Sequence, residues 1–313
     1  MKKYTSIIYL CIVVSILNIF VIIFHSQQKV SSAPLVISDN YRPSGNEGFT
    51  KDVLLPETFS FAGEEVPLHR LDIQEAFRKE LIVNTYLHSH TLQILKTAPR
   101  IFSIIEPILK ENGIPDDFKY LAVIESQLNP LAVSPVGATG IWQFMEETGK
   151  EAGLEVNKEV DERYNIEKAT RAATAYLKKS YERFGSWTMA AASYNAGVSM
   201  VSKQMDIQQE KDYYSLLLGE ETGRYVFRIL ALKQIMNNPG TYYFDKVTPY
   251  PIEKTKKIEV KEPVKEWAAF AKSHDISYKT LKRFNPWLRK TDLTNPRHKT
   301  YEISIPVNTE LYK

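Results

Sequence analysis

Residues Ile114–Ser126 read IPDDFKYLAVIES, and this stretch decides the fold of the region around it. Pro115 suits the first turn of a helix, and the two aspartates behind it suit the positive end of the helix dipole. Four side chains then follow at positions i, i+3, i+4 and i+7, namely Phe118, Leu121, Ala122 and Glu125. Because this spacing places side chains on one helical face, the sequence predicts a buried stripe of three apolar residues and one carboxylate.

Glu125 is the chemically interesting member of this stripe. An ionised carboxylate among apolar neighbours costs several kcal/mol unless it is paired, so we expect its pKa to rise. A partly protonated carboxyl group near neutral pH is suited to general acid catalysis. The same pattern also allows the helix to end here, in which case Glu125 reaches water.

The composition limits the classes of function that this chain can have. A chain of 313 residues, 43% hydrophobic and 12% aromatic, has room for one large or two modest domains with a real core. The net charge of +3 is too small to indicate nucleic-acid binding. The single cysteine, Cys11, excludes an internal disulfide and a cysteine-based metal site. The histidines lack metal-ligand spacing, and we expect His88 and His90 to be surface residues. No metal or cofactor is expected.

The N-terminus indicates membrane targeting. Two lysines precede a nearly unbroken apolar run, Ile7–Phe24, which is at the threshold for spanning a bilayer. The small residues at 31–33 are followed directly by Pro34, which is unfavourable for signal cleavage. We therefore predict that residues 1–26 form an uncleaved signal anchor, with the rest on the periplasmic side of the inner membrane. The alternative is export after cleavage.

Four further segments follow from composition and periodicity. Residues 27–63, rich in Ser, Pro, Gly and Asn, are predicted to be a flexible linker. Residues 64–112 are predicted to be an N-terminal extension of two helices, with the division at Pro99 and no chemistry of their own. Residues 113–245 show helical periods and no strand alternation; a loop ends at Gly140, and the chain is expected to be helical again over 141–145.

Residues 256–308 differ in pattern. Alternating segments at 257–261 and 301–305 predict two strands, with two short helices between them. The order strand, helix, helix, strand predicts a small separate α+β module. The expected fold class of the whole chain is therefore mainly α, with this module at the C-terminal end.

Three fragments stand out in the helical region: Glu125–Ser134 (ESQLNPLAVS), Gly137–Met145 (GATGIWQFM) and Ala192–Gly197 (ASYNAG). In this order and spacing they resemble the signature motifs of the soluble-lytic-transglycosylase family of bacterial cell-wall enzymes. Glu220–Val226 resembles the fourth motif of that family. The upstream helices and Trp142 are most similar to the membrane-bound, D-type members.

The resemblance implies a lysozyme-like helical catalytic domain that cleaves the β-1,4 bond between N-acetylmuramic acid and N-acetylglucosamine in peptidoglycan. The products of the family end in 1,6-anhydro-muramic acid, and no water is consumed. Ordinary glycosidases need two carboxylates. Here the 6-hydroxyl of the sugar attacks, so one carboxyl group can act first as acid and then as base.

The motif positions imply roles for individual residues. Glu125 is the catalytic acid and base, and Tyr225 is expected to hydrogen-bond it. The expected substrate-binding residues are Ser134, Gln143, Tyr194 and Asn195. The two tyrosines lie on apolar stripes, so an alternative is that they belong to the core.

Neighbouring motif residues have other expected roles. Gly137 and Gly140 are expected to allow close approach of the backbone to the sugar. Trp142 is either a stacking surface or a core residue, and Ser126 is expected to support the helix end. The chain departs from the family pattern at Glu146, where proline is usual, and at Ser193, where alanine is usual. These departures put fine substrate preference in doubt rather than activity.

The C-terminal module resembles a degenerate LysM carbohydrate-binding domain that lacks the glycine-containing opening turn. Glycan binding and plain packing both stay open for it. The partners implied by the resemblance are peptidoglycan strands, and the predicted anchor adds the inner membrane.

Two alternatives to a lytic transglycosylase remain. A muramidase that uses water needs a second carboxylate facing Glu125, for which Asp161, Glu162 and Glu147 are the nearby candidates. A catalytically silent peptidoglycan-binding scaffold is the other, and the intact set of motif residues argues against it.

Overall fold

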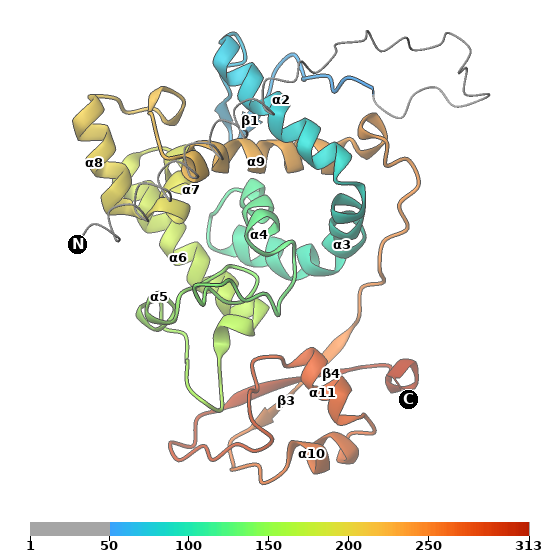
Figure 1. The fold of residues 1–313 in the computed structure, drawn as a ribbon. Helices are drawn as coiled ribbons and strands as arrows, with labels where there is room; N and C mark the ends of the chain where they lie inside the picture. The colour runs from blue at the N-terminus through green and yellow to red at the C-terminus, as the bar shows by residue number, and fades with distance from the viewer. Residues whose placement is uncertain (1–50, 313) are drawn as a thin grey trace, which may run out of the picture. The chain divides into compact units, whose positions relative to one another are not determined.

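The structure is a computed structural model that describes residues 51–312 (Figure 1). Its α-helices are α2 (Leu71–Tyr86), α3 (His88–Glu111), α4 (Lys119–Ser126), α5 (Glu146–Glu151), α6 (Ile166–Phe184), α7 (Trp187–Ala196), α8 (Val198–Gln208), α9 (Glu220–Asn237), α10 (Trp267–Ser273) and α11 (Tyr278–Phe284). The strands are β1 (Ser60–Phe61), β2 (Glu64–Glu65), β3 (Thr255–Val260) and β4 (Tyr301–Pro306). The expected mainly α fold class is confirmed.

The predicted signal anchor, residues 1–26, lies outside the described residues. Within the described range, no helix has both the length and the apolar character needed to cross a bilayer.

The predicted linker does not extend over its last part. Val53 and Phe61 are buried in the main core, and β1 pairs with β2 in a short antiparallel hairpin. The backbone N–H of Ala62 donates to Asp117 at 2.6 Å, which ties the hairpin to the turn before α4. Residues 52–63 are therefore packed rather than flexible, because two apolar side chains find a place in the core.

The helical extension divides at a different residue than expected. α2 ends at Tyr86, Leu87 is the break, and α3 continues from His88 through both Pro99 and Pro107. The prediction of a division at Pro99 is wrong. A proline removes one helical hydrogen bond, but the apolar face of α3 is buried along its length and outweighs that loss.

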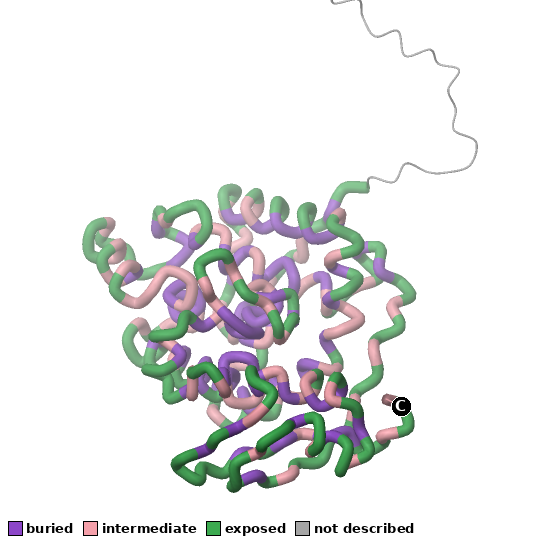
Figure 2. Tube along the Cα trace, turned by 60° about the horizontal axis from the view of Figure 1, so that its bottom comes forward, coloured by how far each residue is buried: buried purple, intermediate pink, exposed green. Residues whose placement is uncertain are grey.

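α4 lies in the middle of the helical region. A 3₁₀ turn (Asp116–Phe118) leads into it, and α4 contacts both α3 and α9. Phe118, Leu121 and Ala122 are buried, as the spacing predicted. Figure 1 shows α4 with α3, α6 and α9 around it, and Figure 2 shows that buried segments follow the inward faces of the helices.

The C-terminal module has the predicted order of elements. β3 and β4 are antiparallel, in register from Thr255 opposite Pro306 to Val260 opposite Tyr301, and α10 and α11 lie between them in sequence. A second hydrophobic core, which includes Trp267, Leu281 and Ile303, holds this module together.

Candidate active site

Glu125 lies in the last turn of α4. The helix ends because Gln127 takes a left-handed conformation, with φ +56°. The hydroxyl of Ser126 donates to the carbonyls of Ala122 (3.2 Å) and Ile141 (3.0 Å). Ser126 therefore fixes the helix end to the following loop, as expected, and holds the backbone next to Glu125 in place.

The carboxyl group of Glu125 is half-buried, and the hydroxyl of Tyr225 on α9 donates a hydrogen bond to it. Burial raises the pKa of Glu125 to about 7, against the opposing effects of this hydrogen bond and of the positive charge of Arg228. The negative charge of Glu221 adds to the rise of the pKa. The predicted direction of the pKa shift is confirmed.

Tyr194 lies close to the same carboxyl group. Its hydroxyl donates to the backbone carbonyl of Trp142 at 2.8 Å, and its ring meets the ring of Tyr176 edge-on at 5.3 Å. Burial and the nearby charge of Glu125 raise the pKa of Tyr194 well above its usual value. Tyr194 and Tyr225 are therefore both core residues and neighbours of the candidate site, because their rings are packed and also lie beside Glu125.

Asn195 connects α7 to the first turn of α9. Its side-chain oxygen accepts from the Thr222 hydroxyl at 2.7 Å, and its Nδ2 donates to Glu221 at 3.2 Å. Asn195 therefore positions Glu221, a residue that the sequence analysis did not single out.

Ser134 and Gln143 both belong to the loop after α4, and both make hydrogen bonds within it. The Ser134 hydroxyl accepts from the N–H of Ala138 at 3.0 Å. The Gln143 amide donates to the carbonyl of Gly140 at 2.8 Å and more weakly to that of Ala132 at 3.3 Å. These two side chains hold the shape of the loop.

The expected helix over 141–145 is absent. This stretch is a turn, Gln143 has φ +50°, and Thr139 pairs with Phe144 in an antiparallel bridge. Trp142 is fully buried and its indole N–H donates to Thr170 at 2.9 Å. It is a core residue rather than a stacking surface.

Glycine is required at position 140 for a structural reason that the sequence did not reveal. Its φ is +81°, and a Cβ placed there would lie 2.0 Å from the carbonyl oxygen of Arg163. The close approach at Gly140 is therefore to the Arg163 backbone and not to a sugar, which corrects the expectation for this residue. Gly137 also has positive φ but open space beside it.

Arg163 holds the loop between α4 and α5 by hydrogen bonds to its backbone. Its guanidinium donates to the carbonyls of Phe144 (3.2 Å) and Gly137 (3.3 Å) and pairs with Asp161 at 2.8 Å. A bidentate arginine of this kind fixes geometry because its donors are held in one plane. Arg163 thus ties the loop that carries Ser134 and Gln143 to the segment 153–165.

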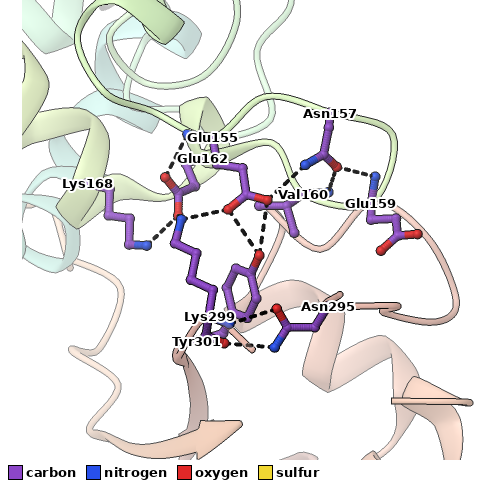
Figure 3. Close-up of polar contacts among 9 residues, drawn as sticks. All are labelled: Glu155, Asn157, Glu159, Val160, Glu162, Lys168, Asn295, Lys299 and Tyr301. Carbon is purple, nitrogen blue, oxygen red and sulfur yellow. Dashed lines mark hydrogen bonds and ion pairs between the residues drawn. The ribbon is translucent and has the colours of Figure 1, made fainter. Parts of the chain in front are cut away.

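The segment 153–165 is in turn bound to the C-terminal module (Figure 3). Glu155 accepts from the Tyr301 hydroxyl at 3.0 Å and pairs with Lys299 at 2.6 Å. The N–H of Asp161 donates to the carbonyl of Trp287 at 2.9 Å, and Val160 is buried in the core of the module. The module therefore packs on the segment that supports the loop carrying Ser134 and Gln143.

The three carboxylates considered for the muramidase alternative contact residues other than Glu125. Asp161 pairs with Arg163, Glu162 is buried beside Lys168 and Lys299, and Glu147 is exposed on α5. Glu221 is the carboxylate that affects the pKa of Glu125. The muramidase alternative, which needs one of the three to face Glu125, finds no support in these contacts.

A cavity of about 560 Å³ is lined by α2, α3 and the first half of α9. Its residues are Glu80, Val83, Asn84, Leu87, His90, Glu220, Glu221, Arg224 and Arg228. His90 is half-buried, so its prediction as a surface residue is wrong. Glu221, Tyr225 and Arg228 share one face of α9 at i, i+4 and i+7; this spacing was the available signal that Glu221 and Arg228 lie near Tyr225.

Comparisons with known proteins agree with the motif resemblance. Residues 102–217 match the transglycosylase SLT domain, and residues 256–309 match the soluble lytic transglycosylase C-terminal LysM-like domain. The membrane-bound lytic murein transglycosylase D of Escherichia coli (strain K12) is 30% identical over 245 residues, covering 76% of this chain and 53% of the relative. A putative tributyltin chloride resistance protein of Alteromonas sp. (strain M-1) is 29% identical over 107 residues, or 34% of this chain and 51% of the relative.

Two solved structures also match parts of the chain, at lower identity. The 70-kDa soluble lytic transglycosylase of Escherichia coli is 24% identical with a TM-score of 0.38, covering 46% of this chain and 24% of that structure. The lytic transglycosylase Slt of Pseudomonas aeruginosa is 23% identical, also with a TM-score of 0.38, and covers 48% and 25%. The chain spans about half the length of the curated relatives it matches.

Proposed function

We propose that this chain, a homologue of lytic murein transglycosylases that carries an SLT domain followed by a LysM-like domain, is itself a peptidoglycan lytic transglycosylase. It would cleave the β-1,4 bond between N-acetylmuramic acid and N-acetylglucosamine and leave 1,6-anhydro ends. The observation that supports this most strongly is Glu125, a half-buried carboxyl group with a pKa of about 7 and a tyrosine hydrogen bond.

The proposed reaction needs one proton donor that becomes a proton acceptor. Protonated Glu125 gives its proton to the glycosidic oxygen as the bond from that oxygen to C1 of the muramic acid breaks. The 6-hydroxyl oxygen of the same sugar forms the new bond to C1, and its proton returns to Glu125. A pKa near the working pH suits both steps, because neither protonation state is strongly disfavoured.

The surrounding residues are proposed to orient the carboxyl group and the sugar. The Tyr225 hydroxyl stabilises the ionised form of Glu125 and fixes its direction. Gln143 uses its amide nitrogen within the loop, which leaves its side-chain oxygen to accept from a sugar hydroxyl or an N-acetyl N–H. Ser134, Tyr194 and Asn195 are proposed to line the same cleft, on the strength of their motif positions.

The product distinguishes this proposal from hydrolysis. Digestion of purified sacculi by the full chain should release muropeptides with anhydro ends, each lighter by one water than the hydrolytic product. Glu125→Gln should release none. Reducing muramic acid ends alone would contradict the proposal.

Hydrolysis is the second candidate because Glu221 is near enough to influence the pKa of Glu125. A hydrolase would need Glu221 to activate water. Glu221→Gln should then abolish product formation, whereas a lytic transglycosylase should keep its anhydro product with this substitution.

The cellular setting is also proposed. Residues 1–26 would anchor the chain in the inner membrane, with residues 113–245 as the catalytic domain on the periplasmic side. Membrane fractionation of the full chain, compared with a chain lacking residues 1–26, tests the anchor.

A further inference from the structure

The β1–β2 hairpin, residues 60–65, contacts or adjoins all three helices that carry the candidate site. Glu125 is on α4, Tyr194 on α7 and Tyr225 on α9. The hairpin meets each helix near the end that is remote from the site. Its contacts lie about 9–12 Å from the site residues along the helix axes. The hairpin also precedes residues 102–217, the part of the chain that matches the SLT domain.

Glu64 on β2 binds the N-terminus of α7 with both carboxylate oxygens. Its Oε1 accepts from the backbone N–H of Trp187 at 2.5 Å, and its Oε2 accepts from that of Thr188 at 2.9 Å. Oε2 also accepts from the hydroxyls of Ser186 (2.9 Å) and Thr188 (2.6 Å). A carboxylate at this end of a helix satisfies free N–H groups and interacts favourably with the helix dipole. Glu64 therefore fixes the position of α7 relative to the hairpin.

Asp117 and Lys233 tie the same hairpin to α4 and α9. The Asp117 carboxylate, in the turn before α4, accepts from the N–H of Ala62 at 2.6 Å and from Lys233 of α9 at 2.7 Å. Lys233 also donates to the carbonyl of Ser60 at 2.7 Å. The Asp117 and Lys233 side chains are only 18% and 14% exposed, so salt screens this pair weakly. The hairpin and these two helices therefore share one charge-assisted network.

A row of aromatic rings packs between the hairpin, α4 and α7. Phe61 of β1 and Phe118, just before α4, are fully buried, with ring centroids 5.2 Å apart. The ring of Phe118 in turn meets that of Trp187, the first residue of α7, at 5.4 Å. Because rings in a close-packed interior have little room to move, the hairpin and the two helices are held at a fixed spacing.

We propose that the β1–β2 hairpin, with Glu64 as its main positioning residue, holds α4, α7 and α9 at the spacing that brings the site residues together. The inference rests on the proposed function in one respect, that Glu125 is the reacting group. Glu64 does not touch the substrate and acts through α7.

Glu64→Ala should therefore change the titration of Glu125. The groups that face Glu125 are Tyr194 from α7 and Tyr225, Glu221 and Arg228 from α9. Loss of the Glu64 hydrogen bonds releases α7, so that Tyr194 covers the carboxyl group less closely and water reaches it. Since burial is the main cause of the raised pKa, the pKa of Glu125 should fall by about 1.

The pKa is measured by ¹³C NMR titration of the Glu125 carboxyl group in the full chain without substrate, and Glu125→Gln identifies the signal. Turnover of glycan strands at pH 5, where Glu125 is protonated in both proteins, gives a second measurement. There, kcat should fall about 10- to 100-fold in Glu64→Ala, because small displacements of reacting groups are costly. The titration needs no turnover, so its result stands whether the parent forms anhydro or hydrolytic ends.

Two substitutions are matched controls. Glu65→Gln removes the neighbouring charge of β2; this side chain is exposed and has no hydrogen bond or ion pair within residues 51–312. Ser277→Ala removes the cap of α11, where the hydroxyl accepts from the N–H of Thr280 at 3.0 Å. It weakens a helix N-terminus, as Glu64→Ala does, but in the C-terminal module. Both controls should keep the pKa of Glu125 and the kcat of the parent.

A parent-like pKa and kcat in Glu64→Ala, at a temperature where circular dichroism shows it fully folded, would overturn the proposal, because Glu64 would then only stabilise the fold. The same pKa change in Ser277→Ala would overturn it as well. Should Glu64→Ala fail to fold, Glu64→Asp keeps the charge with a shorter side chain. Its pKa and kcat should change in the same direction by a smaller amount, and parent-like values would again contradict the proposal.

Discussion

The hydroxyl of Tyr225 donates a hydrogen bond to the carboxyl group of Glu125, although 100 residues separate them in the chain. α4 supplies the acid and α9 supplies its partner, and the two helices are in contact. The hydrogen bond favours the ionised carboxylate while burial disfavours it. Burial has the larger effect, and the result is a group that titrates near neutral pH.

The activity should fall on the alkaline side of about pH 7. In the proposed reaction Glu125 must be protonated at the start, and its pKa is about 7. Above that pH, kcat/KM should decrease by about tenfold per pH unit. Tyr225→Phe removes an interaction that lowers the pKa, so the alkaline limb should move to higher pH while overall activity decreases. Rates measured across pH 5–9 check this; a limb that stays in place would show that Tyr225 does not control the titration.

Folding stability should also depend on Glu125. Its pKa is about 7 in the folded chain against an ordinary value of 4.5, so between these pH values the folded state holds a proton that the unfolded state has lost. Stability contributed by this group is therefore complete below about pH 4.5 and is lost as the pH rises to about 7. Glu125→Gln should be more stable than the parent at pH 8, by at most about 3 kcal/mol, with the difference shrinking at pH 5. Urea unfolding at the two pH values measures it, and an equal difference at both would contradict the assignment.

Gly140→Ala should be severely destabilising. The new Cβ would lie 2.0 Å from the Arg163 carbonyl oxygen, and the φ of +81° adds backbone strain. We expect a loss of about 3–5 kcal/mol in the free energy of unfolding. Gly137→Ala is the matched control: its φ of +88° is as unfavourable, but nothing lies within 4 Å of its Cβ, so about 1 kcal/mol is expected. Similar losses in the two variants would show that the contact with Arg163 is unimportant.

Val160→Ala should weaken the attachment of the C-terminal module. Val160 lies in the segment 153–165, outside the module in sequence, but is fully buried in the core of the module. Removing two buried methyl groups should cost about 1–3 kcal/mol of unfolding free energy. Because segment 153–165 also carries Arg163, we expect a higher KM for peptidoglycan as well. Val133→Ala, at an exposed valine, should change stability by less than about 0.5 kcal/mol.

Much of this protein could be predicted from local sequence. The period of Phe118, Leu121 and Ala122 determined the buried face of α4 and placed Glu125 at its end, because helical geometry repeats every 3.6 residues. Alternation of apolar residues likewise determined the two strands of the C-terminal module. The motifs also indicated the family and singled out Tyr225.

Only the tertiary structure decided the features that depend on residues distant in sequence. The requirement for glycine at position 140 comes from the backbone of Arg163, and the continuity of α3 through Pro99 comes from burial of its apolar face along its length. The cavity lined by Arg228 arises where α2, α3 and α9 meet. A single sequence shows the local preferences of the chain. The burial of a side chain depends on residues that pack against it from elsewhere in the fold, and burial in turn raises the pKa of Glu125.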